Sequence, residues 1–154
     1  MNPLNDLTRL LAIEAIKQLK ARYFRCVDGK DWAGFASVFT HDVHFDITDD
    51  VPGCVLHDPA AIVELTRQGL TGCVSVHHGH CPEIAINDTD NASGIWAMED
   101  MLRWNEGSGS PVRALHGYGH YIETYRRIDG EWRIRTLRLA RLRVDIEAWP
   151  ALDA

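Results

Sequence analysis

The side chains of Asp28 and His77 are of types suited to proton transfer. Asp28 directly follows the last apolar residue of a helical pattern, which places its carboxylate at the rim of a core. Aspartate is also common in turns, so a turn residue is the alternative interpretation. His77 lies in the alternating segment VSVHHGHCPEI. A carboxylate beside an imidazole fixes its tautomer and raises its basicity, so such a pair could take a proton from carbon.

A phenol, that of Tyr23, lies on the core-facing side of the same helical pattern as Asp28. A phenol near the base could hydrogen-bond an oxygen on which negative charge gathers. A tyrosine that only packs in the core is an equally good interpretation of this residue.

Asp100 and Arg141 are charged residues in otherwise apolar strand faces. Asp100 shares its face with four large residues, Trp96, Met98, Leu102 and Trp104. A carboxylate there needs a partner or a raised pKa. The alternative is that the row faces outward at a subunit interface, where Asp100 pairs with an arginine across it.

In the last strand, the residues predicted to share one face are Leu137, Leu139, Arg141 and Arg143. Arg141 is then either the partner of Asp100 or a donor to a ligand oxygen.

A metal site has weaker support in the sequence. His78 and His80 share the strand face opposite to that of His77, which suits a pair of metal ligands, but no third ligand has a diagnostic spacing. We therefore expect no metal and no cofactor. The cysteines lack C-x-x-C spacing, which predicts reduced, mostly buried thiols at Cys26, Cys54, Cys73 and Cys81.

The first half of the chain is predicted to be mainly helical. Apolar residues at steps of three and four predict a helix over about 6–27, stopped at Gly29. A short helix capped by Asp31 should follow and end before Thr40. Alternation then predicts a strand over 43–47, the run DDVPG a turn, and Asp58-Pro59 the start of a helix that ends at Gly69.

The second half is predicted to be an antiparallel meander. Extended segments cover about 74–86, 93–104, 112–128 and 131–145, and Asp129-Gly130 is a strong hairpin signal between the last two. Helices followed by strands indicate an α+β fold over residues 1–154 as a single domain. A strongly twisted sheet with helices across its open side would enclose a cone-shaped apolar pocket.

Composition and charge exclude several classes of protein. The 154 residues are 45% hydrophobic and 25% charged, as in ordinary globular domains. The formal charge of −6 argues against nucleic acid as a partner, although arginines crowd the last third. No apolar stretch is long enough to span a membrane, and the start lacks the pattern of a signal peptide, so we expect a cytoplasmic protein.

The segments IEAIKQLKARYFRCVDGKDW, SVHHGHCPEI and the strand ending in WAMED resemble the bile acid 7α-dehydratase family. That family lies within the SnoaL-like group of NTF2-like proteins, with scytalone dehydratase and hexachlorocyclohexane dehydrochlorinase. By position, the resemblance implies that the catalytic residues are Tyr23, Asp28, His77, Asp100 and Arg141. It also implies a homo-oligomer, for which a trimer is favoured and a dimer is the second choice.

The resulting hypothesis is a dehydratase that needs no cofactor and acts on a hydroxylated steroid, bile acid or related polycyclic ketone. His77, oriented by Asp28, would abstract the proton, and Tyr23 and Arg141 would stabilise the charge on oxygen. An isomerase or cyclase of a polycyclic ketone and a non-catalytic binding module are the alternatives. Apolar patches left by exposed sheet faces that carry Trp96, Trp104 or Trp132 would favour the oligomer.

Overall fold

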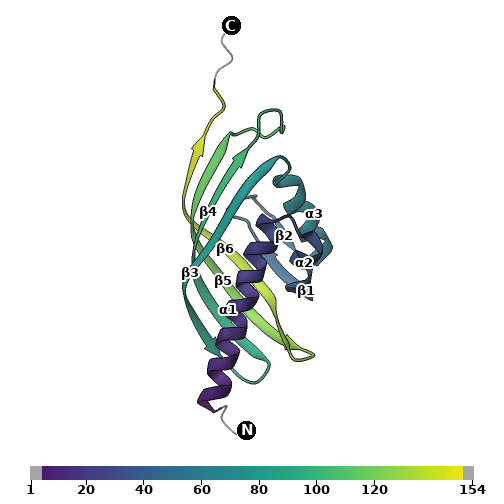
Figure 1. Cartoon of the computed structure of the whole chain (residues 1–154), viewed down its shortest axis with the longest axis vertical. Helices are drawn as coiled ribbons and strands as arrows, with labels where there is room; N and C mark the ends of the chain where they lie inside the picture. The colour runs from purple at the N-terminus through teal and green to yellow at the C-terminus, as the bar shows by residue number, and fades with distance from the viewer. Residues whose placement is uncertain (1–4, 151–154) are drawn as a thin grey trace.

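The computed structural model describes residues 5–150 and has two layers, a curved sheet and helices over its concave face (Figure 1). The helices are α1 (Asp6–Asp28), α2 (Trp32–Ser37) and α3 (Pro59–Gly69). Helix α1 lies along the sheet, and α2 and α3 cover the side near β1 and β2 (Figure 1). The predicted α+β fold is thereby confirmed.

Each helix begins at a polar residue that caps its first turn. The side chains of Asn5, Asp31 and Asp58 each accept a hydrogen bond from the backbone amide three residues further on. The buried stripe of α1 includes Ile16 and Tyr23. These signals are local, and the helices accordingly start where the sequence predicts.

The sheet has six strands in the order β2-β1-β6-β5-β4-β3 and does not close. The strands are β1 (Phe39–Asp46), β2 (Val55–Leu56), β3 (Cys73–Ile86), β4 (Asn91–Trp104), β5 (Ala114–Ile128) and β6 (Glu131–Glu147). All neighbours are antiparallel except β1 and β6, which run parallel. The β5–β6 hairpin turns at Asp129 and Gly130, whose φ values of 52° and 85° suit the predicted tight turn.

Most strand bounds lie within two residues of the prediction, but β1 starts earlier and one short strand is additional. β1 starts at Phe39 rather than at Val43, because the short helix ends at Ser37 and the next residues pair at once with β6. The two-residue β2 was not expected. It forms because Val55 and Leu56 return from the loop after β1 and pair with its last two residues.

A β-bulge in β6 changes which side chains face the concave side. Gly119 pairs with Arg141 and Tyr118 with Arg143, so Leu142 is the extra residue. The side chain of Arg143 is 71% exposed, so the prediction that it shares a face with Arg141 was wrong. After the bulge, Val144 takes up the concave face in its place.

The tryptophans expected on exposed sheet faces lie elsewhere. Trp96 and Trp132 are buried on the concave side, and Trp104 is partly buried. The other face of the sheet carries smaller exposed apolar residues, at Val74, Val76, Ile95, Ile122 and Leu142. The apolar surface proposed for an oligomer is therefore aliphatic.

A buried polar network lies beneath α1. The ammonium group of Lys20 contacts a carboxylate oxygen of Glu123, and the Tyr125 hydroxyl donates to the other. Trp96 Nε1 donates to the Tyr125 oxygen over 2.8 Å. Every charge in the network has a partner, as burial at this depth requires.

Only half of the cysteines fit the expectation of mostly buried thiols. Cys26 and Cys73 are buried, Cys54 is partly buried, and Cys81 is exposed in the β-bulge of β3. Burial raises the pKa of the Cys26 and Cys73 thiols. Within residues 5–150, no helix is both long and apolar enough to cross a membrane.

Candidate active site

A cavity of about 530 Å³ lies between the concave face of the sheet and the three helices. Its wall is mostly apolar, with contributions from Phe45, Leu65, Leu102, Leu137 and Leu139. The polar residues that line it are Tyr23, Asp49, Asp50, Thr66, His77, Asp100, Tyr121 and Arg141. An apolar cavity with a few convergent polar groups is the usual form of a site for a small organic ligand.

Asp28 and His77 form a hydrogen-bonded pair at the edge of this cavity. His77 Nδ1 lies 2.6 Å from Asp28 Oδ1. The backbone amide of His77 donates to Asp28 Oδ2 over 2.8 Å, and the Ser75 hydroxyl donates to Oδ1 over 2.9 Å. Asp28 therefore joins the end of α1 to β3, and its carboxylate does not cap a helix.

The surroundings of Asp28 favour its charged form. Burial alone would raise its pKa, but the hydrogen bonds from the ring and the amide of His77 outweigh it and lower the pKa. The Ser75 hydroxyl acts in the same direction and itself accepts a hydrogen bond from Lys30 Nζ over 2.7 Å. Asp28 is thus a carboxylate at neutral pH, with its acceptor atoms aimed at His77.

This geometry assigns the tautomer of His77. A carboxylate only accepts hydrogen bonds, so Nδ1 carries the proton and Nε2 has a free lone pair. Within the described part of the chain, no protein group hydrogen-bonds to Nε2. His77 lines the cavity, and this nitrogen has the lone pair that accepting a proton requires.

Asp100 lies directly opposite His77, since the two residues pair across β3 and β4. Its carboxylate is held by Arg141, which donates from Nη1 to Oδ1 over 2.8 Å and from Nη2 to Oδ2 over 2.7 Å. Gly117 faces Asp100 from β5, and a Cβ there would overlap the carboxylate and the guanidinium. The glycine therefore leaves the space that this ion pair occupies.

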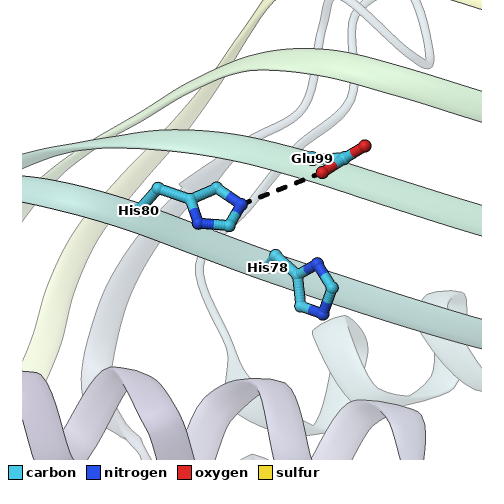
Figure 2. Close-up of side chains that lie close together, drawn as sticks. All are labelled: His78, His80 and Glu99. Atoms are coloured by element: carbon cyan, nitrogen blue, oxygen red, sulfur yellow. Dashed lines mark ion pairs between the residues drawn. The ribbon is translucent and has the colours of Figure 1, made fainter.

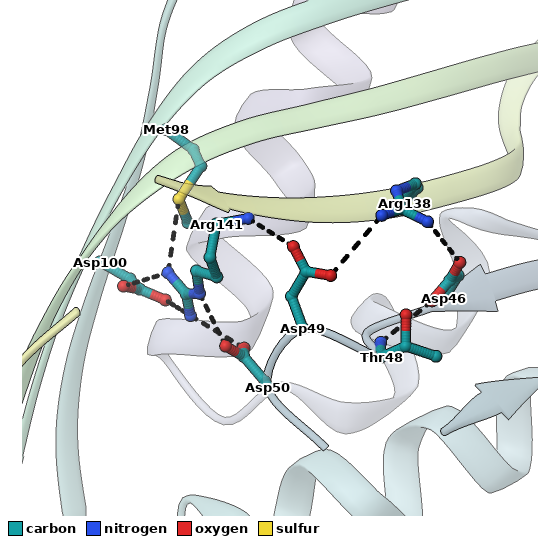
Figure 3. Close-up of polar contacts among 8 residues, drawn as sticks. All are labelled: Asp46, Thr48, Asp49, Asp50, Met98, Asp100, Arg138 and Arg141. Atoms are coloured by element: carbon teal, nitrogen blue, oxygen red, sulfur yellow. Dashed lines mark hydrogen bonds and ion pairs between the residues drawn. The ribbon is translucent and has the colours of Figure 1, made fainter. Parts of the chain in front are cut away.

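Arg141 also binds the loop between β1 and β2 (Figure 3). Nε and Nη2 donate to the two oxygens of Asp50 over 2.7 and 2.9 Å, and the Arg141 backbone amide donates to Asp49 over 2.9 Å. Nη1 has a further contact with Met98 Sδ at 3.5 Å. All five N–H groups of the guanidinium thus have protein acceptors.

The sequence left two roles open for Arg141, and this geometry supports the first. Arg141 is the partner of Asp100, and in this arrangement it has no N–H group left for a ligand oxygen. Burial would lower the pKa of Arg141, but its hydrogen bonds to Asp50 and Asp100 raise it. The outward-facing alternative for Asp100 is wrong, because its side chain is only 5% exposed and lines the cavity.

Two tyrosines line the cavity, Tyr23 from α1 and Tyr121 from β5. Burial, the nearby Glu123 and other carboxylates raise the pKa of Tyr23 far above its ordinary value. Burial and the neighbouring Tyr23 do the same for Tyr121. Both hydroxyls therefore keep their protons at neutral pH.

All five residues expected at the site are brought together, four of them in the cavity wall and Asp28 behind His77. Sequence reasoning missed Tyr121, Asp49, Asp50 and Ser75. The alternation of LHGYGHYIETY could have placed Tyr121 on the face of Gly117. For the two loop aspartates no local signal exists, because their partner Arg141 is 91 and 92 residues away.

Comparison with known proteins gives the same fold. A family model described as the SnoaL-like domain matches residues 8–138. Rv3472 from Mycobacterium tuberculosis, a protein of unknown function, is 26% identical with a TM-score of 0.73, over 87% of this chain and 78% of that chain.

Two further solved structures are similar over almost their whole length. A candidate scytalone dehydratase from Novosphingobium aromaticivorans has 18% identity and a TM-score of 0.79, over 96% of this chain and 97% of that chain. Hexachlorocyclohexane dehydrochlorinase LinA-type3 from Novosphingobium barchaimii has 19% identity and a TM-score of 0.78, over 97% and 99%. At identities this low, the likeness establishes the fold alone.

Proposed function

The chain belongs to the SnoaL-like domain family, and we propose that it is a lyase that eliminates water without a cofactor. The observation that carries the proposal is the 2.6 Å contact between His77 Nδ1 and Asp28, which leaves Nε2 free at the cavity wall. The dehydratase and dehydrochlorinase names of two similar structures support a lyase. From the resemblance to bile acid 7α-dehydratases we further propose a substrate of the bile acid or steroid type.

In the proposed reaction, His77 Nε2 takes a proton from a carbon next to a conjugated carbonyl group. The electron pair of the broken C–H bond moves toward the carbonyl oxygen, and Tyr23 hydrogen-bonds the charge that develops there. Return of the electron pair then expels the hydroxyl group, which leaves as water with the proton from His77. Proton and hydroxide together account for the water lost.

Asp28 and Asp100 have supporting roles in this proposal. Directly opposed residues in an antiparallel pair have Cβ atoms about 5 Å apart, so Asp100 is close to the His77 ring. When His77 is protonated, the carboxylates on both sides stabilise the imidazolium. Arg141 holds Asp100 in place, so we assign Arg141 to positioning rather than to the substrate oxygen.

The cavity favours a rigid, apolar ligand with few oxygens. Its wall is mainly apolar, and the polar side chains that face it include the facing pair His77 and Asp100 and the tyrosine hydroxyls. A hydroxylated steroid, bile acid or related polycyclic ketone has this distribution. The loop that carries Asp49 and Asp50 lines the same cavity, so it would contact the bound ligand.

Incubation with a panel of hydroxylated steroid enones should test the reaction. We expect at least one product that is lighter by one water molecule and absorbs at longer wavelength because its conjugation is extended. A product of unchanged mass would identify an isomerase or cyclase instead. If compounds of the panel bind but none is converted to a product, a non-catalytic module would be favoured. EDTA should not change turnover.

We also propose that the protein is cytoplasmic and forms a homo-oligomer. A trimer is favoured, and a dimer is the second choice. The exposed aliphatic residues on the convex face, which include Val74 and Ile122, are the surface that a second copy would cover. Light scattering at micromolar concentration should give about three times the 17.4 kDa of one chain. A mass of one chain under these conditions would rule the oligomer out.

A further inference from the structure

The convex face of the sheet, opposite the cavity, carries a second group of polar side chains. His78 and His80 project from β3 and Glu99 from β4 (Figure 2). His78 pairs directly with Glu99 across the two strands, and His80 is one step along on the same face. Nothing in the proposed reaction uses these residues.

The donor atoms of this group converge. One ligand atom from each of His78, His80 and Glu99 lies within 4.8 Å of the others. His80 Nε2 is 3.8 Å from Glu99 Oε2 (Figure 2). Bonds of about 2.0–2.2 Å to a tetrahedral ion put ligand atoms roughly 3.5 Å apart, so rotation of exposed side chains is enough to close the group around a metal.

We propose that His78, His80 and Glu99 bind one divalent cation of the zinc type. Two imidazoles and a carboxylate suit zinc, whereas calcium and magnesium prefer a shell made of oxygens. Three protein ligands leave a fourth position for water. The ion would lie on the convex side of the sheet and would join β3 to β4.

A further pair of residues holds Glu99 in the position that the metal requires. His116 Nε2 lies 2.7 Å from Glu99 Oε1, the oxygen that does not face His80. The Tyr118 hydroxyl lies 3.2 Å from His116 Nδ1, so it can donate there while Nε2–H donates to Glu99. Hydrogen-bonded supports of this kind orient the carboxylates and imidazoles that bind metals.

The sequence could not identify this site, because its third ligand is adjacent only through strand pairing. Glu99 is separated from His80 by a turn and most of a strand, with no spacing that marks it as a ligand. Only the register of β3 against β4 brings the carboxylate beside the two rings.

Titration of the purified, EDTA-treated protein with Zn²⁺ in a calorimeter should detect one ion per chain. The variants His78→Ala, His80→Ala and Glu99→Gln should each weaken zinc binding at least about tenfold, the smallest loss typical of residues around a metal. Co²⁺ in place of zinc should give the visible absorption of a tetrahedral site, and each variant should lose it. Melting temperatures without metal would show that the three variants are folded.

His120→Ala is the matched control. His120 is on β5 and pairs with Ala97, so it lies on the same face outside the converging group. This variant should bind zinc as the unaltered protein does. The proposal is wrong if the unaltered protein does not bind zinc, if any of the three ligand variants keeps native affinity, or if His120→Ala loses as much. Fewer than one ion per chain would also contradict a site built from a single chain.

Discussion

Replacing His77 by alanine should lower kcat at least a hundredfold, because general bases typically contribute that much or more. The loss should come without unfolding. Asp28 keeps two of its three hydrogen bonds in the variant, those from the backbone amide of residue 77 and from Ser75. Steady-state kinetics on a substrate found in the panel, with the melting temperature measured alongside, would check both parts.

The control for this variant is His120→Ala, which removes a histidine from the convex face of the sheet. It should leave kcat and the melting temperature near their native values. If His77→Ala keeps more than about a tenth of native turnover, the loss is smaller than removal of a general base produces, and His77 is not the base.

The parts of the fold that were predictable are those with local causes. Asp31 and Asp58 cap the helices that follow them by accepting from amides three residues further on, and Asp129-Gly130 makes a turn that is complete within the hairpin. Strand alternation placed His77 and Asp100 correctly relative to their neighbours. These features depend on a few consecutive residues, so a single sequence contains the necessary information.

The bulge in β6 could not be predicted from the residues of that strand alone. Strict alternation predicts that Arg143 shares the face of Arg141, but the extra residue Leu142 reverses the pattern. Whether a strand bulges depends on its pairing with the neighbouring strand, here at Tyr118 and Gly119. Alternation within one strand does not contain that information.

The residues of the candidate site could be selected from the sequence, but not all of their hydrogen-bond partners could. Asp28, His77 and Asp100 could be singled out because a carboxylate or imidazole beside apolar residues is unusual. Asp50 could not, because a loop aspartate is ordinary and only its distance to Arg141 makes it part of the site. Because that contact uses N–H groups of Arg141, we propose that Arg141 supports the site and does not donate to the ligand.

Asp28→Asn tests whether the carboxylate acts through the base. In the native pair, one oxygen accepts from the His77 amide and the other from Ser75 and the ring. Asparagine has one oxygen, so if it accepts from the His77 amide, its NH₂ group faces the ring. Nδ1 must then accept, and the proton moves to Nε2, where it blocks the base. We expect kcat to fall on the order of a hundredfold or more.

The stability of Asp28→Asn should change in a way that depends on pH. The pKa of Asp28 is lowered in the folded protein, so its carboxylate contributes stability above the unfolded value of 3.8 and loses it as pH falls through the folded pKa. At neutral pH the variant lacks this contribution, and we expect its melting temperature to lie within a few degrees below that of the native protein. As the pH falls below 3.8, the difference in unfolding free energy between the native protein and the variant should shrink, and urea denaturation would measure it.

Asp58→Asn is a matched control, because Asp58 also lies at a helix end and accepts a hydrogen bond from a backbone amide, over 3.1 Å from Ala61. Asparagine caps helices about as well as aspartate, so this variant should keep both native stability and native kcat. If Asp28 only terminated α1, Asp28→Asn would be as mild as this control.

The pH profile separates the two roles of Asp28 most directly. Activity should fall on the acid side, because a protonated His77 cannot accept a proton from the substrate. The ring of His77 lowers the pKa of Asp28, so by linkage the carboxylate stabilises the imidazolium, and its removal should move the acid limb of the kcat profile to lower pH. A purely structural aspartate would change the height of the profile and leave the position of this limb unchanged. A variant with native turnover, or with an unmoved acid limb, would therefore exclude the Asp28–His77 pair from the mechanism.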